Sequence, residues 1–329
     1  MQAAELIKKA SIYHHESDLR KKCPTYLKER LSKNQKILEA CRRPFEILGL
    51  HDDDSFYPPW VIKERDEIFR LIAESLLQTS RQPDNYDNMS KIYDIITDIE
   101  ARVTILGKKI KYDMFRVKTG RLATNSDSFP ILNLPKNQRH CIKPEKDFLV
   151  EFDYNAMDLR VLLGLSDTPQ PKVDIHDWIR REVFSNTISR DESKKMVFSW
   201  LYGKKIPEAS KFEKIFNKKI ICDKFYKGGE IKNLYGRIVQ CDSDFFAMNY
   251  IVQSTANDLF FEQLYRVRGL LHEHNSKIMF CIHDCFVLDF DKAEVFLLKK
   301  IKSVLEDTSL GKFKVNIKIG KTYGDMRSQ

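Results

Sequence analysis

The pattern of hydrophobic and polar residues predicts a helical first part followed by a part that mixes helices and strands. Residues 1–48 are rich in Lys, Glu and Leu, a turn-rich break covers 49–59, and hydrophobic residues at helical spacing follow at 68–76 and 92–106. The apolar run 148–152 predicts a buried strand that stops at Asp153. Two apolar runs within 277–289 flank His283 and Asp284 as in a tight hairpin, and 313–319 predicts one more strand. The pattern therefore favours an α+β fold.

Composition narrows the class of protein only slightly. The chain has 329 residues, of which 42% are hydrophobic and 31% charged, and this balance excludes a mainly disordered chain. No apolar run reaches the roughly 18 residues of a membrane helix, and the first residues lack the apolar core of a secretion signal. Seven cysteines without a CxxC pair fit a reducing compartment. We expect a cytoplasmic protein without a membrane partner, whose net charge of +9 favours anionic partners.

Two aspartates stand where predicted strands end. Asp153 follows the first buried strand, and Asp284 lies in the turn of the predicted hairpin. If these carboxylates meet in the fold, they form an oxygen-ligand site suited to Mg²⁺, which binds through one or two carboxylates plus substrate phosphates. The alternative is that each aspartate is a turn or cap residue. A zinc site at Cys281, His283 and Cys285 is disfavoured, because no second ligand pair with the usual spacing follows.

A predicted helix after residue 188 carries an unusual stripe. Ser189 and Glu192 form a capping box at its start. Every fourth residue along it lies on one slowly winding face, which holds two cations and then two aromatic rings: Arg190, Lys194, Phe198 and Tyr202. Cations followed by aromatic rings suit a nucleotide, whose phosphates and flat base lie at opposite ends. A partly exposed helix with its cations reaching solvent is the alternative.

The next segment, 201–240, has ten Lys or Arg against four acids, which suits either a solvated surface or a nucleic-acid face.

Six blocks of residues follow one another in order between 119 and 290. They are Thr119–Leu122 with Asn133–Pro135, Asp153–Arg160, Asp174–His176 with Val183-Phe184, the stripe with Gly203, Gly236-Arg237 with Asn249–Gln253, and Ile282–Asp284. Together they resemble the family A DNA polymerases, which include bacterial DNA polymerase I and its phage and mitochondrial relatives. Asp153–Arg160 looks like motif A of that family, the stripe like motif B, and Ile282–Asp284 like motif C. Residues 1–118 contain no matching motif.

The resemblance implies a right-hand polymerase fold with a palm built on an antiparallel sheet, helical fingers and a helical thumb. By this analogy 119–165 and 247–329 form the palm, 166–246 the fingers, and 1–118 a thumb-like region with palm connections. We expect no 3′–5′ exonuclease in a chain of this size, so a separate exonuclease or a processivity factor is an expected partner. A phage or plasmid replication protein, or a repair enzyme, fits this size.

The resemblance also implies an activity, namely template-directed addition of dNTPs to a primer 3′-hydroxyl with release of pyrophosphate. Asp153 and Asp284 would be the catalytic residues and would hold two Mg²⁺ ions. The implied dNTP-binding residues are Arg190, Lys194, Phe198, Tyr202, His176 and Asp158. The implied contacts with primer–template DNA are Arg121, Asn133, Arg160, Asn249, Gln253 and His283.

Several positions depart from the family pattern. Asp158 stands where the family usually has a Glu that blocks the 2′-hydroxyl, so we expect weaker rejection of ribonucleotides. Cys285 replaces the carboxylate that commonly follows the motif C aspartate, and Phe245 replaces an arginine. Two alternatives therefore stay open: a single-subunit RNA polymerase or primase-like enzyme, and a catalytically degenerate nucleic-acid-binding protein.

Overall fold

The computed structural model describes residues 85–114, 116–201, 204, 206–241 and 243–329. The chain divides into two compact units, 1–86 and 87–329, and the description below concerns the second. The helices predicted before residue 85 lie outside the described residues, as does most of the predicted thumb-like region.

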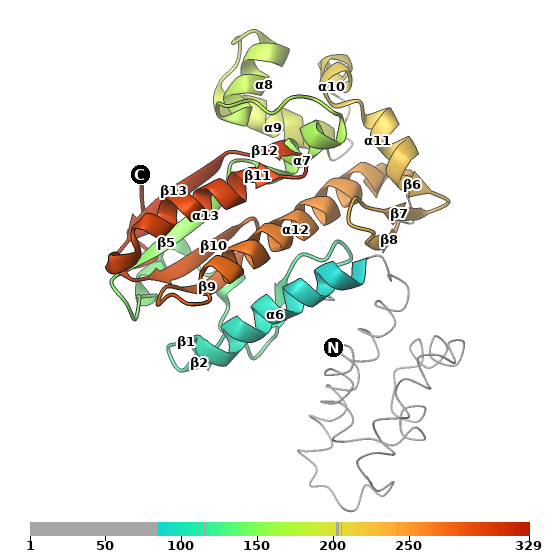
Figure 1. Ribbon diagram of the computed structural model, residues 1–329. Coiled ribbons are helices and arrows are strands. Elements are labelled where there is room, and N and C mark those ends of the chain that lie inside the picture. The colour runs from blue at the N-terminus through green and yellow to red at the C-terminus, as the bar shows by residue number, and fades with distance from the viewer. Residues whose placement is uncertain (1–84, 115, 202–203, 205, 242) are drawn as a thin grey trace, which may run out of the picture. The chain divides into compact units, whose positions relative to one another are not determined.

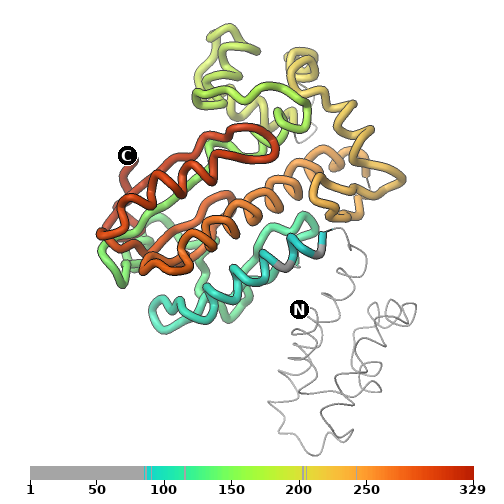
Figure 2. Tube along the Cα trace, viewed as in Figure 1, coloured from blue at the N-terminus to red at the C-terminus, as the bar shows by residue number. Residues whose placement is uncertain are grey.

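A five-stranded antiparallel sheet forms the centre of the second unit, with strand order β14-β13-β5-β10-β9 (Figure 1). Its strands are β5 (Phe148–Tyr154), β9 (Lys277–Ile282), β10 (Cys285–Phe290), β13 (Val315–Gly320) and β14 (Arg327–Ser328). The predicted strand, the predicted hairpin and the last predicted strand are therefore confirmed, with small shifts at their ends. Figure 2 shows how β5 lies between strands that come more than 120 residues later in the chain.

Alternation along β5 gives the sheet one apolar face and one polar face. Phe152 stacks on Phe286 of β10, with ring centroids 5.4 Å apart. Phe260, from a helix on that side, contacts both Phe286 and Tyr154. Because successive side chains of a strand point to opposite faces, Asp153 lies on the other face. The core on the apolar face thus determines where this carboxylate points.

Two helices cover the apolar face of the sheet (Figure 1): α12 (Asp244–Leu270) and α13 (Phe296–Glu306). The side chain of Ser243 caps the start of α12 by accepting a hydrogen bond from the Phe245 amide. Short elements flank α13, namely η5 (Lys292–Glu294), β11 (Asp307–Thr308) and β12 (Gly311–Lys312). The long helix α12 reaches beyond the sheet, so it connects the strands with the helices of the middle segment.

The middle segment is mostly helical. It contains α7 (Met157–Leu165), α8 (Ile175–Phe184), α9 (Arg190–Leu201), α10 (Ala209–Phe216) and α11 (Lys218–Phe225). A small sheet follows, built from β6 (Tyr226–Lys227), β7 (Glu230–Lys232) and β8 (Ile238–Gln240). Trp200 stacks on Phe212 with ring centroids 5.3 Å apart, and Phe184 meets the same ring edge-on. This aromatic cluster holds α8, α9 and α10 together.

The segment before β5 begins with α6 (Tyr86–Arg102). The hydrophobic stripe predicted a helix over 92–106, so α6 starts six residues before the predicted helix and ends four residues before its predicted end. After it come β1 (Thr104–Ile105), β2 (Lys108–Lys109), β3 (Tyr112–Asp113), β4 (Ala123–Thr124), η3 (Ile131–Asn133) and η4 (Lys136–Cys141). The Tyr112 hydroxyl donates to the Cys281 carbonyl and accepts from its amide, which anchors this segment to the edge strand β9. Among the described residues, no helix has the length and apolar content needed to cross a membrane.

Candidate active site

Strand register brings the two aspartates together. Asp153 lies directly opposite Cys285 in the β5–β10 pair, and Asp284 immediately precedes Cys285 in the turn after β9. The amide of Tyr154 donates to the Asp284 carbonyl oxygen at 3.4 Å, so the two acidic positions are adjacent across the strands. A third carboxylate, Asp158 on the first turn of α7, lies near enough to raise the pKa of Asp284. We call Asp153, Asp158 and Asp284 the acid cluster.

Burial disfavours the ionised form of two members of the acid cluster, and neighbouring acids add to this effect. Burial and then the charge of Asp158 raise the pKa of Asp284 to about 7, against the opposing effect of Arg121. Burial and the nearby Glu151 also raise the pKa of Asp153, although Lys318 and Lys194 favour its ionised form. Carboxylates with too little positive charge around them favour a cation.

Arg121 is the cation nearest to two members of the acid cluster. Its Nη2 donates to both carboxylate oxygens of Asp158 at 3.0 Å and lies 3.9 Å from Asp284 Oδ1. The resemblance implied that Arg121 contacts DNA and that Asp158 contacts the nucleotide sugar. The structure joins these two side chains in one ion pair at the edge of the site.

The donor set of the acid cluster fits Mg²⁺. Within the described part of the chain, no three His, Cys, Asp or Glu side chains converge into a ready-made metal site, and this holds also for Cys281, His283 and Cys285. Mg²⁺ needs fewer protein ligands, because it keeps water and takes substrate phosphates as its remaining ligands. Asp153 and Asp284 are therefore the residues that would hold such an ion. Cys285 cannot replace a carboxylate there, since burial and the charges of Glu151 and Asp153 raise its pKa well above the usual value and keep the thiol neutral.

The capping box predicted at Ser189 is present and starts α9. The Ser189 amide donates to Glu192 Oε2 at 2.9 Å, and the Glu192 amide donates back to Ser189 Oγ at 3.2 Å. Arg190 is the first residue of α9, and its Nη2 donates to Asp174 Oδ2 at 2.8 Å. Asp174 itself caps α8 by accepting from the amides of His176 and Asp177. Although burial opposes it, hydrogen bonds from Arg190 and Asn155 lower the pKa of Asp174 far below the usual range.

His176 lies between the cations of the stripe and its first aromatic ring. It is buried, its ring centroid lies 6.1 Å from that of Phe198, and its Nδ1 has no hydrogen-bond partner among the described residues. Burial lowers the pKa of His176 to about 4, and the charges of Arg190 and Lys194 act in the same direction against Asp174. Lys194 also acts on Asp153, so its charge lies within electrostatic reach of both His176 and the acid cluster. The last residue of the stripe, Tyr202, and the predicted helix end at Gly203 lie outside the described residues.

The implied DNA-binding residues have different surroundings. Gln253 donates to Asn249 Oδ1 at 2.8 Å on α12, and both lie one helical turn apart on the same face. His283 is exposed in the turn beside Asp284, with a left-handed backbone (φ +50°), and partial burial together with Arg121 lowers its pKa. Asn133 is exposed at the end of η3. These three positions are compatible with a contact to a ligand.

Arg160 does not fit the predicted contact with DNA. Its side chain is completely buried and donates to the carbonyl oxygens of Asn155, Pro171 and Val173 and to Asn155 Oδ1. These bonds fasten the end of β5 and the start of α7 to the segment that precedes α8. The sequence does not distinguish this role from DNA binding, because a guanidinium group donates hydrogen bonds to carbonyl oxygens and to phosphates alike.

Two ion pairs near the site, one buried and one partly exposed, were not predicted from the sequence, although Arg237 belongs to one of the blocks that carry the resemblance. Arg237 Nη2 lies 2.6 Å from Asp258 Oδ1 in the interior. Gly120, at φ +83°, packs against this pair, and a Cβ atom there would come within 2.7 Å of the Arg237 guanidinium carbon. On the polar face of the sheet, Lys318 Nζ lies 2.5 Å from Glu151 Oε1, and Glu151 is two residues before Asp153 on β5. The Lys318–Glu151 pair joins strands that are 167 residues apart in the sequence, whereas Arg237 and Asp258 are 21 residues apart.

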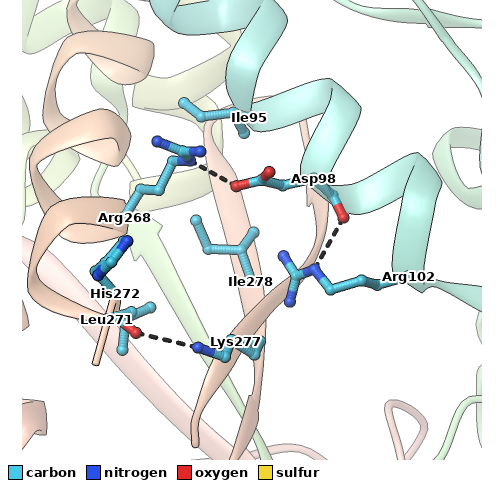
Figure 3. A pocket seen from close by; sticks show the side chains of 8 residues that line it. All are labelled: Ile95, Asp98, Arg102, Arg268, Leu271, His272, Lys277 and Ile278. Atoms are coloured by element: carbon cyan, nitrogen blue, oxygen red, sulfur yellow. Dashed lines mark hydrogen bonds and ion pairs between the residues drawn. The ribbon is translucent and has the colours of Figure 1, made fainter. Parts of the chain in front are cut away.

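A separate cavity, lined by both charged and apolar side chains, lies at the far end of the hairpin (Figure 3). It measures about 300 Å³, and Arg268, which is paired with Asp98 at 2.5 Å, contributes to its lining. Lys277 also faces it and donates to the Leu271 carbonyl. Because Lys277 begins β9 and Asp284 follows its end, about 16 Å of strand separates this cavity from the acid cluster. The cavity is therefore not part of the candidate active site.

One solved structure shows what this arrangement resembles. The chain is similar to the polymerase domain of Pol1 from M. smegmatis in complex with DNA primer–template and dNTP, with a TM-score of 0.58 and 15% sequence identity. The match covers 98% of this chain, which spans 66% of the length of that one. No protein-family model matches the sequence, and no curated protein does. The chain therefore has a fold similar to that of a DNA polymerase domain.

Proposed function

We propose that this protein is a template-directed DNA polymerase of the family A type, which adds dNTPs to a primer 3′-hydroxyl and releases pyrophosphate. The observation that carries the proposal is the pairing of β5 with β10, which sets Asp153 beside Asp284 while the charge of Lys194 reaches Asp153. The similarity of the fold to a polymerase domain supports it. Placement among phage, plasmid or repair polymerases stays a prediction.

In this proposal the central sheet with α12 and α13 is the palm, covering 119–165 and 247–329. The helices between them, 166–246, are the fingers, and 1–118 supply a thumb-like region with palm connections. The acids then come from the palm and the cations from the fingers. A dNTP and the primer end would meet between these two groups of side chains.

Asp153 and Asp284 would hold two Mg²⁺ ions. When bound, such ions activate the primer hydroxyl and neutralise the negative charge that develops on the phosphates. The two carboxylates bind a cation in their ionised form, so the raised pKa of Asp284 makes its binding of metal dependent on pH near neutrality.

The chain's own cations would bind the triphosphate. Arg190 and Lys194 stand at the start of α9 and would bring positive charge to a phosphate group. Arg190 would first have to leave its ion pair with Asp174. His176 is neutral at pH 7, so one ring nitrogen donates to a phosphate oxygen without adding a charge. Phe198 would flank the nucleotide base beside His176, and Asp158, held by Arg121, would face the sugar.

Primer extension with Mg²⁺ tests the proposal. The Asp284→Asn variant keeps the shape of the turn but loses the charge, and we expect its extension rate to fall by about 1000-fold, since a metal ligand contributes several kcal/mol to the transition state. Asp289→Asn, near the far end of the strand that follows Asp284, is the matched control and should keep wild-type activity.

The outcomes separate the candidate functions. Undiminished extension by Asp284→Asn contradicts the assignment of the acid cluster. Extension with ribonucleotides alone favours the RNA polymerase or primase-like enzyme. DNA binding without any extension by the wild type favours the catalytically degenerate protein.

A further inference from the structure

The cavity at the far end of the hairpin is lined by more cations than acids (Figure 3). Arg102 ends α6, Arg268 lies in the last turn of α12, and Lys277 begins β9. His272, which follows α12, is exposed and also lines the cavity. Among the described residues that line the cavity, Asp98 is the one acid. A concave site with an excess of positive charge attracts an anion.

Arg102 is anchored at one end of its guanidinium group and open at the other. Its Nε donates to the carbonyl oxygen of Asp98 at 3.0 Å, and the side chain is exposed. Within the part of the chain that the structure describes, its two Nη groups have no hydrogen-bond partner. The N–H groups of a guanidinium bind phosphate or carboxylate oxygens in pairs. Arg102 is therefore held in place and still able to bind an anion.

Lys277 and Arg268 differ in how much of their charge is already used. Lys277 Nζ donates to the Leu271 carbonyl oxygen at 3.3 Å, which occupies one of the three N–H groups of the ammonium. Arg268 Nε lies 2.5 Å from Asp98 Oδ2, so these two charges largely cancel. The positive charge that remains for a ligand comes mainly from Arg102 on α6 and Lys277 on β9.

The walls and the size of the cavity limit the kind of anion. Ile95 and Ile278 are 1% and 5% exposed and form an apolar part of the lining. The volume of about 300 Å³ is at the lower end for small-molecule sites. Cations from separate elements approach from different directions, which suits the tetrahedral oxygens of a phosphate better than the two coplanar oxygens of a carboxylate. Together these features fit a compact ligand with a phosphate group and a small apolar part.

We propose that this cavity is a binding site for the phosphate group of a small ligand. Arg102 binds two phosphate oxygens, Lys277 binds a third, and Ile95 and Ile278 contact the organic part. Bound in this way, the ligand connects α6 with β9 and the end of α12, so binding stabilises the folded chain. About 16 Å of strand separates the cavity from the acid cluster, so the inference does not depend on the proposed function.

Isothermal titration calorimetry of the full chain with inorganic phosphate tests the proposal. The buffer contains EDTA and keeps the ionic strength constant, so that neither a metal–phosphate complex at the acid cluster nor general screening contributes to the signal. We expect saturable binding by the wild type. Arg102→Gln should weaken this binding about ten-fold to a hundred-fold, because it removes charge-assisted hydrogen bonds. Lys277→Gln should weaken it by a similar factor.

Two control variants locate the bound phosphate. Lys108→Gln removes the same charge from an exposed position of β2 that does not line the cavity, and it should change the affinity less than two-fold. Lys194→Ala removes a cation of the stripe on α9 and should leave phosphate binding unchanged. Thermal unfolding checks that each variant is folded, and phosphate should raise the midpoint for the wild type but not for Arg102→Gln. Because Arg102 is exposed, its variant decides the result if Lys277→Gln does not fold.

Several outcomes would overturn the inference. Absence of saturable binding by the wild type, or an equal loss in Arg102→Gln and Lys108→Gln, would show that the cavity is not a site. A loss in Lys194→Ala alone would place the phosphate on α9. Tighter binding of citrate than of phosphate would identify a carboxylate ligand, and displacement of the phosphate by blunt duplex DNA would assign the cavity to a nucleic-acid backbone. Primer extension, which tests the proposed function, is a separate measurement.

Discussion

The acids and the cations of the candidate site are positioned in different ways. Asp153 and Asp284 are held by backbone pairing, because β5 lies between β10 and β13 and a slip of one residue would turn every side chain to the other face. Arg190 stands on a helix end and is held by a side-chain pair with Asp174 in which its own side chain is 44% exposed. The strands therefore hold the acids in fixed positions. Arg190 is held by its ion pair with Asp174, and another anion could replace Asp174 as its partner.

The acids and Arg190 would therefore respond differently to a charged ligand. Burial and the charge of Asp158 disfavour the ionised form of Asp284, and a bound cation would offset this cost. Arg190 is paired with Asp174, whose pKa the pairing lowers far below the usual range, so a phosphate would have to compete with Asp174 for Arg190. Four substitutions test the two sides of the site.

Among these four substitutions, the largest effect on the KM for dNTP should come from Lys194→Ala. We expect the KM for dNTP to rise about ten-fold to a hundred-fold, because a charge-assisted hydrogen bond to a phosphate contributes roughly 1.5–3 kcal/mol. Steady-state primer extension over a range of dNTP concentrations measures it. Lys195→Ala is the matched control, since it removes the same charge from an exposed position on another face of α9. Equal effects of the two variants would contradict the assignment of the stripe.

Asp158→Glu should improve the rejection of ribonucleotides. The added methylene extends the carboxylate toward the sugar, and one methylene is worth roughly a ten-fold discrimination in a fitted pocket. The measurement is the ratio of kcat/KM for a dNTP to that for the matching rNTP, in which general effects on activity cancel. An unchanged ratio would mean that the ion pair with Arg121 already compensates for the shorter side chain.

A smaller effect is expected from Asp174→Asn. Asparagine keeps the cap of α8 but removes the charge that competes for Arg190, so the KM for dNTP should fall by up to about five-fold. Asp177→Asn, which changes a half-exposed acid of the same helix that is paired with Arg180, serves as the control. A rise in KM would show instead that Asp174 is needed to orient Arg190.

The smallest effect concerns stability and pH. Because the folded state raises the pKa of Asp284 to about 7, its ionised form is less favourable in the fold than in the unfolded chain. The destabilisation is absent below about pH 4, grows as the pH rises to 7, and stays complete above it. Asp284→Asn should therefore gain stability over the wild type between pH 5 and pH 8 in EDTA, measured by urea unfolding. Asp223→Asn, an exposed acid of α11, should show no such difference, and a gain independent of pH would contradict the explanation.

Much of the local structure followed from residues close together in the sequence. The apolar run before Asp153, the two runs around His283 and the Ser189 capping box each predicted an element that is present. The start of α6 was missed, because its first turn lies before the hydrophobic stripe. The polar roles were harder to predict. Arg160 matches a motif position and yet is buried among carbonyl oxygens, while Phe245, which replaces an arginine of the family pattern, is exposed and contacts the ring of Phe246.

Which short segments become strands and helices follows from the sequence, since periodicity and capping act over a few residues. The position of Asp153 opposite Cys285, the pairing of Arg121 with Asp158 and the exposure of Phe245 arise in the folded chain. These contacts join segments from 37 to 132 residues apart or depend on what packs around a side chain. Their energies come from register, burial and charge in the folded chain, which no local pattern contains.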